Sequence, residues 1–425
     1  MIASIPARLR LDNAANIYPA SMSKHYSSLY RMKVTLVDDI DTDILQTALL
    51  HVSERIPTFR CTLRSGAFWW YLDRCNAIPS VRPVKPLKHF AFKDQDGLLY
   101  RVSADGKEIM LDVFHALADG NGAMVFLLTL AGEYIRLRYG VLITYNQMVW
   151  DPREKPAYAE VEDSFKTVFS GCHGQLEKDV SAYHIKGSTL PFSAVKDLRA
   201  VLSADAFKSV CKAYDCTVTE LITATMLWAL QEEHRKDNNP RKRSVLKVSV
   251  PVNLRPLYGS RTVRNFSSYV NLGVDVKEGY YSFPDLVKSV KTQKAHDLRK
   301  DQLEVKVAAN VELEEMLLVR LLPLKIKHPI IDIINLLHGD RFVSQTLSNM
   351  GNLNVPAEMR PYITDADFIL GRQRGNSGAF SCVSYNGKMY LHMTRKISSD
   401  RFETAFLQQL SALGLSVSTQ VSNLA

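Results

Sequence analysis

A strand that passes directly into a helix is predicted over residues 108–130, EIMLDVFHALADGNGAMVFLLTL. Apolar side chains occupy alternate positions from Ile109 to Val113, which predicts a strand, and the run after Gly122 is almost entirely apolar, which predicts a buried or amphipathic helix. The strand forms the second arm of a hairpin over 97–114, because Asp105-Gly106 suits its turn. This unit favours a fold in which helices cover a sheet.

Strands and helices alternate along the rest of the chain. Strands are predicted over 27–40, 58–73 (two short ones), 189–203, 244–256, 268–276, 347–356 and 380–395 (a hairpin), and helices over 41–57, 203–234, 283–322 and 400–414, the last closing the chain. Both halves combine helices with sheet strands, so the predicted fold class is α/β (α+β). The apolar and basic stretch 321–339 is either a membrane-facing or lid helix, or a core helix broken by Pro323 and Pro329.

Length and composition set further bounds. The 425 residues, 46% of them hydrophobic, can form a large core in two domains or two halves of one architecture. No signal peptide or membrane span is evident, and the six cysteines lack metal-ligand spacing, so we expect free thiols, no metal and a cytoplasmic location. The net charge of +9 fits a solvated basic surface, an anionic membrane or a phosphorylated ligand; no nucleic-acid-binding module is present.

His115 is the residue in this stretch that turn chemistry does not explain. Asp119 and the glycines at 120 and 122 suit a turn that leads into a closely packed helix. A histidine at a strand end can hold Nδ1 on the backbone and present Nε2 to a cleft as a general base near neutral pH. The alternative is a histidine satisfied by local hydrogen bonds. Asp119 is too close in sequence to complete a triad, and we expect it to pair with an arginine.

The stretch HALADG resembles the HxxxDG signature of CoA-dependent acyltransferases related to chloramphenicol acetyltransferase, a superfamily that includes condensation domains and plant acyltransferases. LRLDNAANIYPA precedes this stretch, and VPVNLRP, RNFSSYVNL and LSNMGNLNVP follow it. The ordered set looks most like the alcohol O-acetyltransferase branch. The resemblance covers nearly the whole chain. Phe114 replaces the first histidine of condensation domains, and DFILG (367–371) lacks the tryptophan of the plant motif.

The resemblance implies two chloramphenicol-acetyltransferase-like sandwiches with a tunnel between them. We expect an N-terminal half over 1–175 that carries the motif, a connection over 176–188 and a C-terminal half over 189–425. The motif residues His115, Asp119 and Gly120 would form the catalytic loop, with His115 as general base and Asp119 in a salt bridge to Arg255.

Ser348 and Asn349 are candidates for the oxyanion site or the tunnel wall, although capping of the turn before Gly351 explains them equally well. The implied reaction moves an acetyl or other short acyl group from acyl-CoA, a co-substrate, to an alcohol or amine, without a bound cofactor. Two alternatives remain open: an acyl donor carried by a carrier protein, and a catalytically idle binding protein of the same fold.

Overall fold

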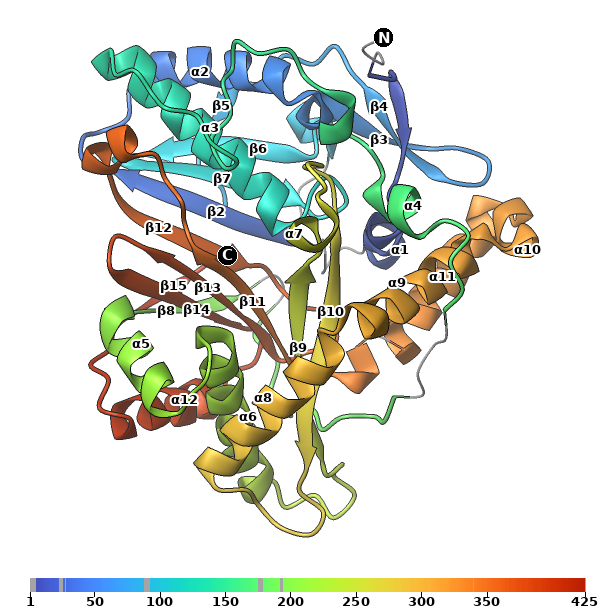
Figure 1. The fold of residues 1–425 in the computed structure, drawn as a ribbon, viewed down its shortest axis with the longest axis vertical. Coiled ribbons are helices and arrows are strands. Elements are labelled where there is room, and N and C mark those ends of the chain that lie inside the picture. Colours follow the sequence, from blue (N-terminus) through green and yellow to red (C-terminus); the bar gives the residue numbers. More distant parts are fainter. Residues whose placement is uncertain are drawn as a thin grey trace.

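A computed structural model describes residues 5–22, 26, 28–87, 92–174, 179–191, 194–338 and 340–424, which form two halves, each built on its own sheet. The first sheet has the order β12-β2-β7-β6-β5. Its strands are β2 (Leu29–Leu36), β5 (Val81–Arg82), β6 (Tyr100–Asp105), β7 (Glu108–Phe114) and β12 (Ile363–Leu370). Two helices, α2 (Thr42–Arg55) and α3 (Gly120–Tyr139), cover one face of this sheet (Figure 1).

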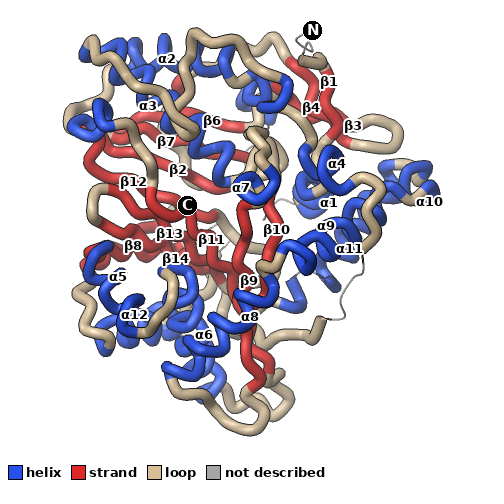
Figure 2. Tube along the Cα trace, in the orientation of Figure 1, coloured by secondary structure: helices blue, strands red, loops and turns tan. Residues whose placement is uncertain are grey.

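The second sheet has the order β10-β9-β11-β13-β14-β8-β15. Its strands are β8 (Lys196–Ser203), β9 (Val245–Asn253), β10 (Ser267–Asp275), β11 (Gln345–Asn352), β13 (Gly378–Tyr385), β14 (Lys388–Arg395) and β15 (Ser418–Asn423). The helices α5 (Ala204–Ala213), α6 (Val218–Lys236), α8 (Phe283–Asp297) and α12 (Arg401–Ala412) cover its outer side. The strands of these two sheets thus occupy the middle of the molecule, with most helices outside them (Figure 2).

The remaining elements surround the two sheets. A small third sheet consists of β1 (Arg8–Arg10), β4 (Trp70–Arg74) and β3 (Cys61–Ser65). The other helices are α1 (Ile17–Ser21), α4 (Ser164–Phe169), α7 (Arg255–Tyr258), α9 (Lys300–Glu315), α10 (Leu317–Leu321) and α11 (Leu324–His338). Short 3-10 turns span Ala14–Asn16, Pro57–Arg60, Phe92–Gln95, Tyr158–Glu160, Asp340–Phe342 and Ala357–Tyr362. In the described part of the chain, every helix is too short or too polar to cross a membrane.

Local sequence features place most element ends correctly. Asp41 caps α2 by accepting from the backbone N–H groups of residues 43 and 44, and Ser203 and Thr217 cap α5 and α6. Asn386 and Gly387 both have positive φ, +48° and +72°, as a type I′ hairpin turn requires. The break predicted at Pro329 is wrong, because α11 continues through it. Pro329 has no N–H to donate to the carbonyl of Lys325, one helical turn earlier. Both residues are solvent-exposed, so water can replace that hydrogen bond.

Two strands that the sequence did not reveal change the topology. β12 leaves the second half and pairs antiparallel with β2, so the two sheets do not divide the chain cleanly at residues 176–188. Of that connection, 179–188 contain no helix or strand and 176–178 lie outside the described residues. β15 follows α12 and pairs with β8, so the last helix does not close the chain.

A buried ionic cluster joins the two sheets where β12 crosses. His392 on β14 contacts Asp197 on β8 at 2.9 Å and Asp367 on β12 at 2.8 Å, and all three side chains are buried. Burial alone would lower the pKa of His392, but the two carboxylates outweigh it and raise the pKa to about 9. His392 is therefore charged at neutral pH, and Asp367 also contacts Lys33 and Arg199.

This cluster should make the protein less stable at alkaline pH. A histidine pKa raised from 6.5 to about 9 gives stabilisation that is complete below pH 6.5 and disappears as pH rises through 9. We expect the free energy of unfolding in urea to fall by up to about 3 kcal/mol over that interval. The His392→Gln variant should have a lower free energy of unfolding at neutral pH, and this free energy should fall much less as the pH rises. Equal losses in the parent and the variant would show that His392 carries no charge in the native protein.

Candidate active site

His115 lies where β7 ends and the loop before α3 begins. Its backbone N–H donates to the carbonyl of Ser28 at 3.1 Å, which continues the pairing of β7 with β2. The imidazole stacks on the ring of Tyr18 with centroids 4.3 Å apart and meets the ring of Tyr30 edge-on at 5.2 Å. The residue remains partly exposed to solvent. Two aromatic rings therefore fix the plane of the imidazole, whereas the tunnel remains a prediction.

A residue of the second half holds one ring nitrogen. His115 Nδ1 lies 3.1 Å from Oδ1 of Asn265, which is buried just before β10. Since an amide oxygen only accepts, Nδ1 carries the proton and Nε2 keeps a lone pair. No described residue forms a hydrogen bond with Nε2. Sequence reasoning missed Asn265, although it lies within the stretch RNFSSYVNL.

The environment of His115 favours the neutral imidazole. Burial lowers its pKa below 6.5, and the opposing effects of its own backbone, Asp119 and Asn265 are smaller. At pH 7 the ring is therefore unprotonated at Nε2 and able to accept a proton.

Asp119 is turned away from the imidazole and is fully engaged. It caps α3 by accepting from Gly122 N–H at 3.0 Å, and its other oxygen accepts from Phe266 N–H at 3.0 Å. Arg255, the first residue of α7, forms two hydrogen bonds with the same carboxylate, at 2.9 and 3.0 Å. The ion pair predicted between Asp119 and Arg255 is present and buried. It joins α3 of the first half to α7 of the second (Figure 1).

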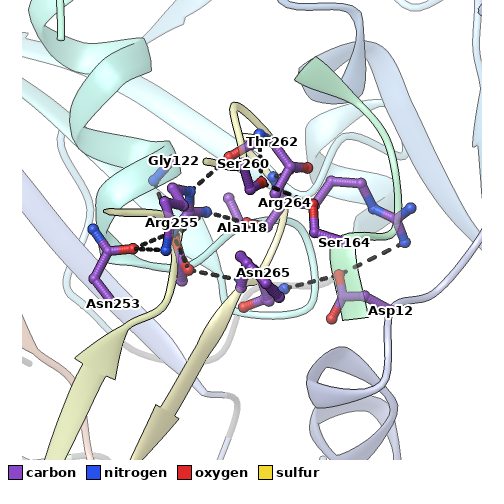
Figure 3. A network of polar contacts seen from close by, with 12 residues as sticks. Asp12, Ala118, Gly122, Ser164, Asn253, Arg255, Ser260, Thr262, Arg264 and Asn265 are labelled. Atoms are coloured by element: carbon purple, nitrogen blue, oxygen red, sulfur yellow. Dashed lines mark hydrogen bonds and ion pairs between the residues drawn. The ribbon is translucent and has the colours of Figure 1, made fainter. Parts of the chain in front are cut away.

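The guanidinium of Arg255 is held from several sides. Its Nε donates to the carbonyl of Thr262 at 2.7 Å, Nη2 donates to the carbonyl of Arg264, and Nη1 donates to Oδ1 of Asn253 at 3.2 Å. Figure 3 shows Arg255 within this network, close to Asn253, Thr262 and Gly122. The arginine therefore organises the loop that leads from α7 into β10.

The motif glycine, Gly120, and the nearby Gly122 differ in what surrounds them. A Cβ atom on Gly122 would lie 1.9 Å from the backbone oxygen of Val263, so α3 and the loop before β10 touch there. A Cβ atom on Gly120 would instead meet the sulfur of Met350, at 2.9 Å, which is the far end of a flexible side chain. Met350 belongs to β11, and this contact brings the end of that strand to the motif loop.

Ser348 and Asn349 lie on the same strand, β11. Both ends of the Asn349 amide are engaged, because Nδ2 donates to Oγ1 of Thr219 at 3.0 Å and Oδ1 accepts from Gly351 N–H at 2.8 Å. This is the turn-capping role considered as the alternative for Asn349. A role for Ser348 at an oxyanion remains a prediction. In the described ranges, no group of three His, Cys, Asp or Glu side chains is arranged to hold a metal ion.

We expect Gly122→Ala to destabilise the protein much more than Gly120→Ala. The first substitution forces backbone against backbone, whereas the second requires only that Met350 change rotamer. Thermal unfolding of the two variants tests this, with Gly120→Ala as the matched control. Similar melting temperatures would mean that α3 and the loop before β10, which contains Val263, are not in close contact.

Asp119→Asn should weaken both folding and the proposed activity. Losing one partner of a buried, hydrogen-bonded ion pair costs on the order of 3–5 kcal/mol, and the His115 loop begins four residues earlier. Asp73→Asn breaks the surface pair with Arg8 and should cost much less. Urea unfolding of both variants measures the difference, and equal losses would contradict a structural role for the buried pair.

Comparison with known proteins supports the fold. No protein-family model and no curated protein matches the chain. Among solved structures, polyketide synthase associated protein 5 from Mycobacterium tuberculosis is similar with a TM-score of 0.66 at 15% identity, over 97% of this chain and 99% of that one. Trichothecene 15-O-acetyltransferase from Fusarium sporotrichioides gives a TM-score of 0.61 at 12% identity, over 96% and 94%.

The first condensation domain of the CDA synthetase is also similar, with a TM-score of 0.58 at 14% identity, over 96% of this chain and 97% of that domain. All three likenesses extend over both halves. The chain therefore has the mixed α/β, two-lobed fold of condensation domains and chloramphenicol-acetyltransferase-like proteins.

Proposed function

We propose that this protein is an acyltransferase that moves a short acyl group, such as acetyl, from acyl-CoA to a hydroxyl or amine, with His115 as general base. The observation that carries the proposal is the state of His115: Nδ1 is held by Asn265, Nε2 has no partner among the described residues, and the pKa is lowered. A histidine that served only packing would have no need of a free, unprotonated nitrogen at a partly exposed position.

The proposed reaction needs only one proton carrier. Nε2 of His115 removes the proton from the acceptor as its oxygen or nitrogen attacks the thioester carbonyl. The resulting tetrahedral intermediate collapses, the carbon–sulfur bond breaks, and the imidazolium returns the proton to the leaving thiolate. The products are the acylated acceptor and free CoA, and His115 ends in its original neutral form. The hydroxyl of Ser348 is our candidate donor to the oxyanion.

The donor and acceptor follow from the sequence resemblance. The stretches that resemble alcohol O-acetyltransferases favour acyl-CoA and an alcohol, and one similar structure is named as an O-acetyltransferase. Similarity to a condensation domain supports the second candidate, an acyl group delivered by a carrier protein. Incubation with acetyl-CoA and a panel of alcohols and amines, followed by release of free thiol, tests the first. Transfer only from an acylated carrier protein would support the second candidate. If no acyl group is transferred from either donor, the result would favour an idle binding protein.

His115→Ala should fold and bind CoA normally but lose turnover by roughly 10²–10⁴-fold, the usual contribution of a general base. His296→Ala, which removes an exposed histidine on α8, serves as control and should keep full activity. Equal rates for His115→Ala and the parent would refute the mechanism.

The pH dependence gives a second test of the base. Because burial lowers the pKa of His115, the rate of the parent should rise with pH and reach half its maximum below pH 6.5. Initial rates between pH 4.5 and 8, corrected for unfolding, measure this limb. A half-maximum well above pH 7 would exclude a neutral, desolvated His115 as the base.

A further inference from the structure

A buried carboxylate lies behind the asparagine that holds His115. Asp12 is fully buried just before the first 3-10 turn, and its Oδ1 accepts from Ala15 N–H at 2.8 Å. Its Oδ2 lies 3.4 Å from Nδ2 of Asn265 and 3.6 Å from a guanidinium nitrogen of Arg264. Figure 3 shows Asp12, Arg264 and Asn265 as one polar network on the side away from Arg255.

This arrangement fixes the orientation of the Asn265 amide. The carboxylate of Asp12 requires the NH₂ group to face it, so Oδ1 must face His115 Nδ1. Three segments distant in sequence therefore form one chain of contacts, Asp12–Asn265–His115. The same N-terminal segment also supplies Tyr18, whose ring stacks on the imidazole.

We propose that Asp12 and Asn265 are positioning residues for His115: the amide selects the tautomer that leaves Nε2 free, and the carboxylate behind it stabilises the imidazolium formed during transfer. This inference rests on the proposed function and deepens it. Asp119 cannot bond the ring directly, because Arg255 and two backbone N–H groups occupy its oxygens, although its charge also favours the imidazolium.

Most other charged or titratable groups near His115 are neutral or already paired. Burial raises the pKa of Tyr18 and of Tyr30 well above 10, so both phenols are neutral. Arg264, which lies just before β10, contacts Asp12, and the charge of Arg255 is neutralised by Asp119. Burial raises the pKa of Asp12 to about 7, partly opposed by Arg264, so its charge develops as the solution becomes neutral.

Three variants separate positioning from packing. Asn265→Ala should lower kcat by roughly 10–100-fold with little change in KM for the acceptor, less than the loss of the base itself. Asn265→Asp places a carboxylate directly on Nδ1 and should move the acidic limb of the rate to higher pH by about one unit or more. Asp12→Asn should reduce kcat most above pH 7, where the parent carboxylate is charged, and should leave the limb below pH 6.5 in place. A shift of the limb confined to Asn265→Asp does not follow from a loss of packing.

Asn239→Asp provides the matched control. Asn239 lies in the loop between α6 and β9, where its Oδ1 accepts from the backbone N–H of Arg241, a role that a carboxylate keeps. It adds the same charge as Asn265→Asp and should leave both kcat and the pH profile unchanged. An acidic limb that moves equally in the two variants, or in neither, would overturn the proposal. Circular dichroism and thermal unfolding identify any variant that fails to fold.

Nitrogen NMR of ¹⁵N-histidine-labelled protein supplies a test that needs no substrate. With His115 assigned from the His115→Ala spectrum, the parent should show a protonated Nδ1 and an unprotonated Nε2 at pH 8. Asn265→Ala should shift the population toward the Nε2-protonated tautomer. A parent ring protonated at Nε2, or one unchanged by Asn265→Ala, overturns the inference. If the NMR result holds while the parent transfers no acyl group, the positioning is correct and the proposed function is wrong.

Discussion

The carboxylate of Asp119 gathers donors from three separate parts of the chain, and the geometry of the candidate site depends on it. The N–H of Gly122 comes from the helix that Asp119 caps, the guanidinium of Arg255 from α7, and the N–H of Phe266 from the start of β10. A buried charge is tolerated only when its oxygens are satisfied in this way. Because these donors come from both halves, the carboxylate fixes the loop of His115 relative to the loop of Asn265.

Two histidines show how neighbours decide protonation in this fold. His392 lies between two carboxylates, which hold its pKa near 9 and keep it charged where the sheets meet. His115 meets two aromatic rings and a neutral amide instead, and burial lowers its pKa. The same side chain is therefore a cation at neutral pH in one place and a neutral imidazole, as the proposed base requires, in the other.

The sequence predicts what is determined locally. Helix caps at Asp41 or Asp43 and at Thr217 or Thr219, the Asn386-Gly387 turn and the strand-to-helix passage at His115 depend on neighbouring residues. The structure uses Asp41 and Thr217 as caps and has the turn and the passage. The pairing of Asp119 with Arg255 could be predicted only from the resemblance. Asn265 and Asp12 were missed because their contacts with His115 span both halves. β12 was missed because Asp365 and Asp367 interrupt its apolar pattern, and their partners come from other strands.

The crossing of β12 also governs the order in which the molecule can be completed during synthesis. Thr364 bonds the carbonyl of Thr35 across 329 residues of chain. At ribosomal speed that interval lasts roughly tens of seconds, during which one edge of β2 has no strand beside it. Unpaired edges of this kind invite association with other chains. Nascent copies of this protein should therefore depend on chaperones until β12 emerges, and truncations that remove β12 should damage the first half as well as the second.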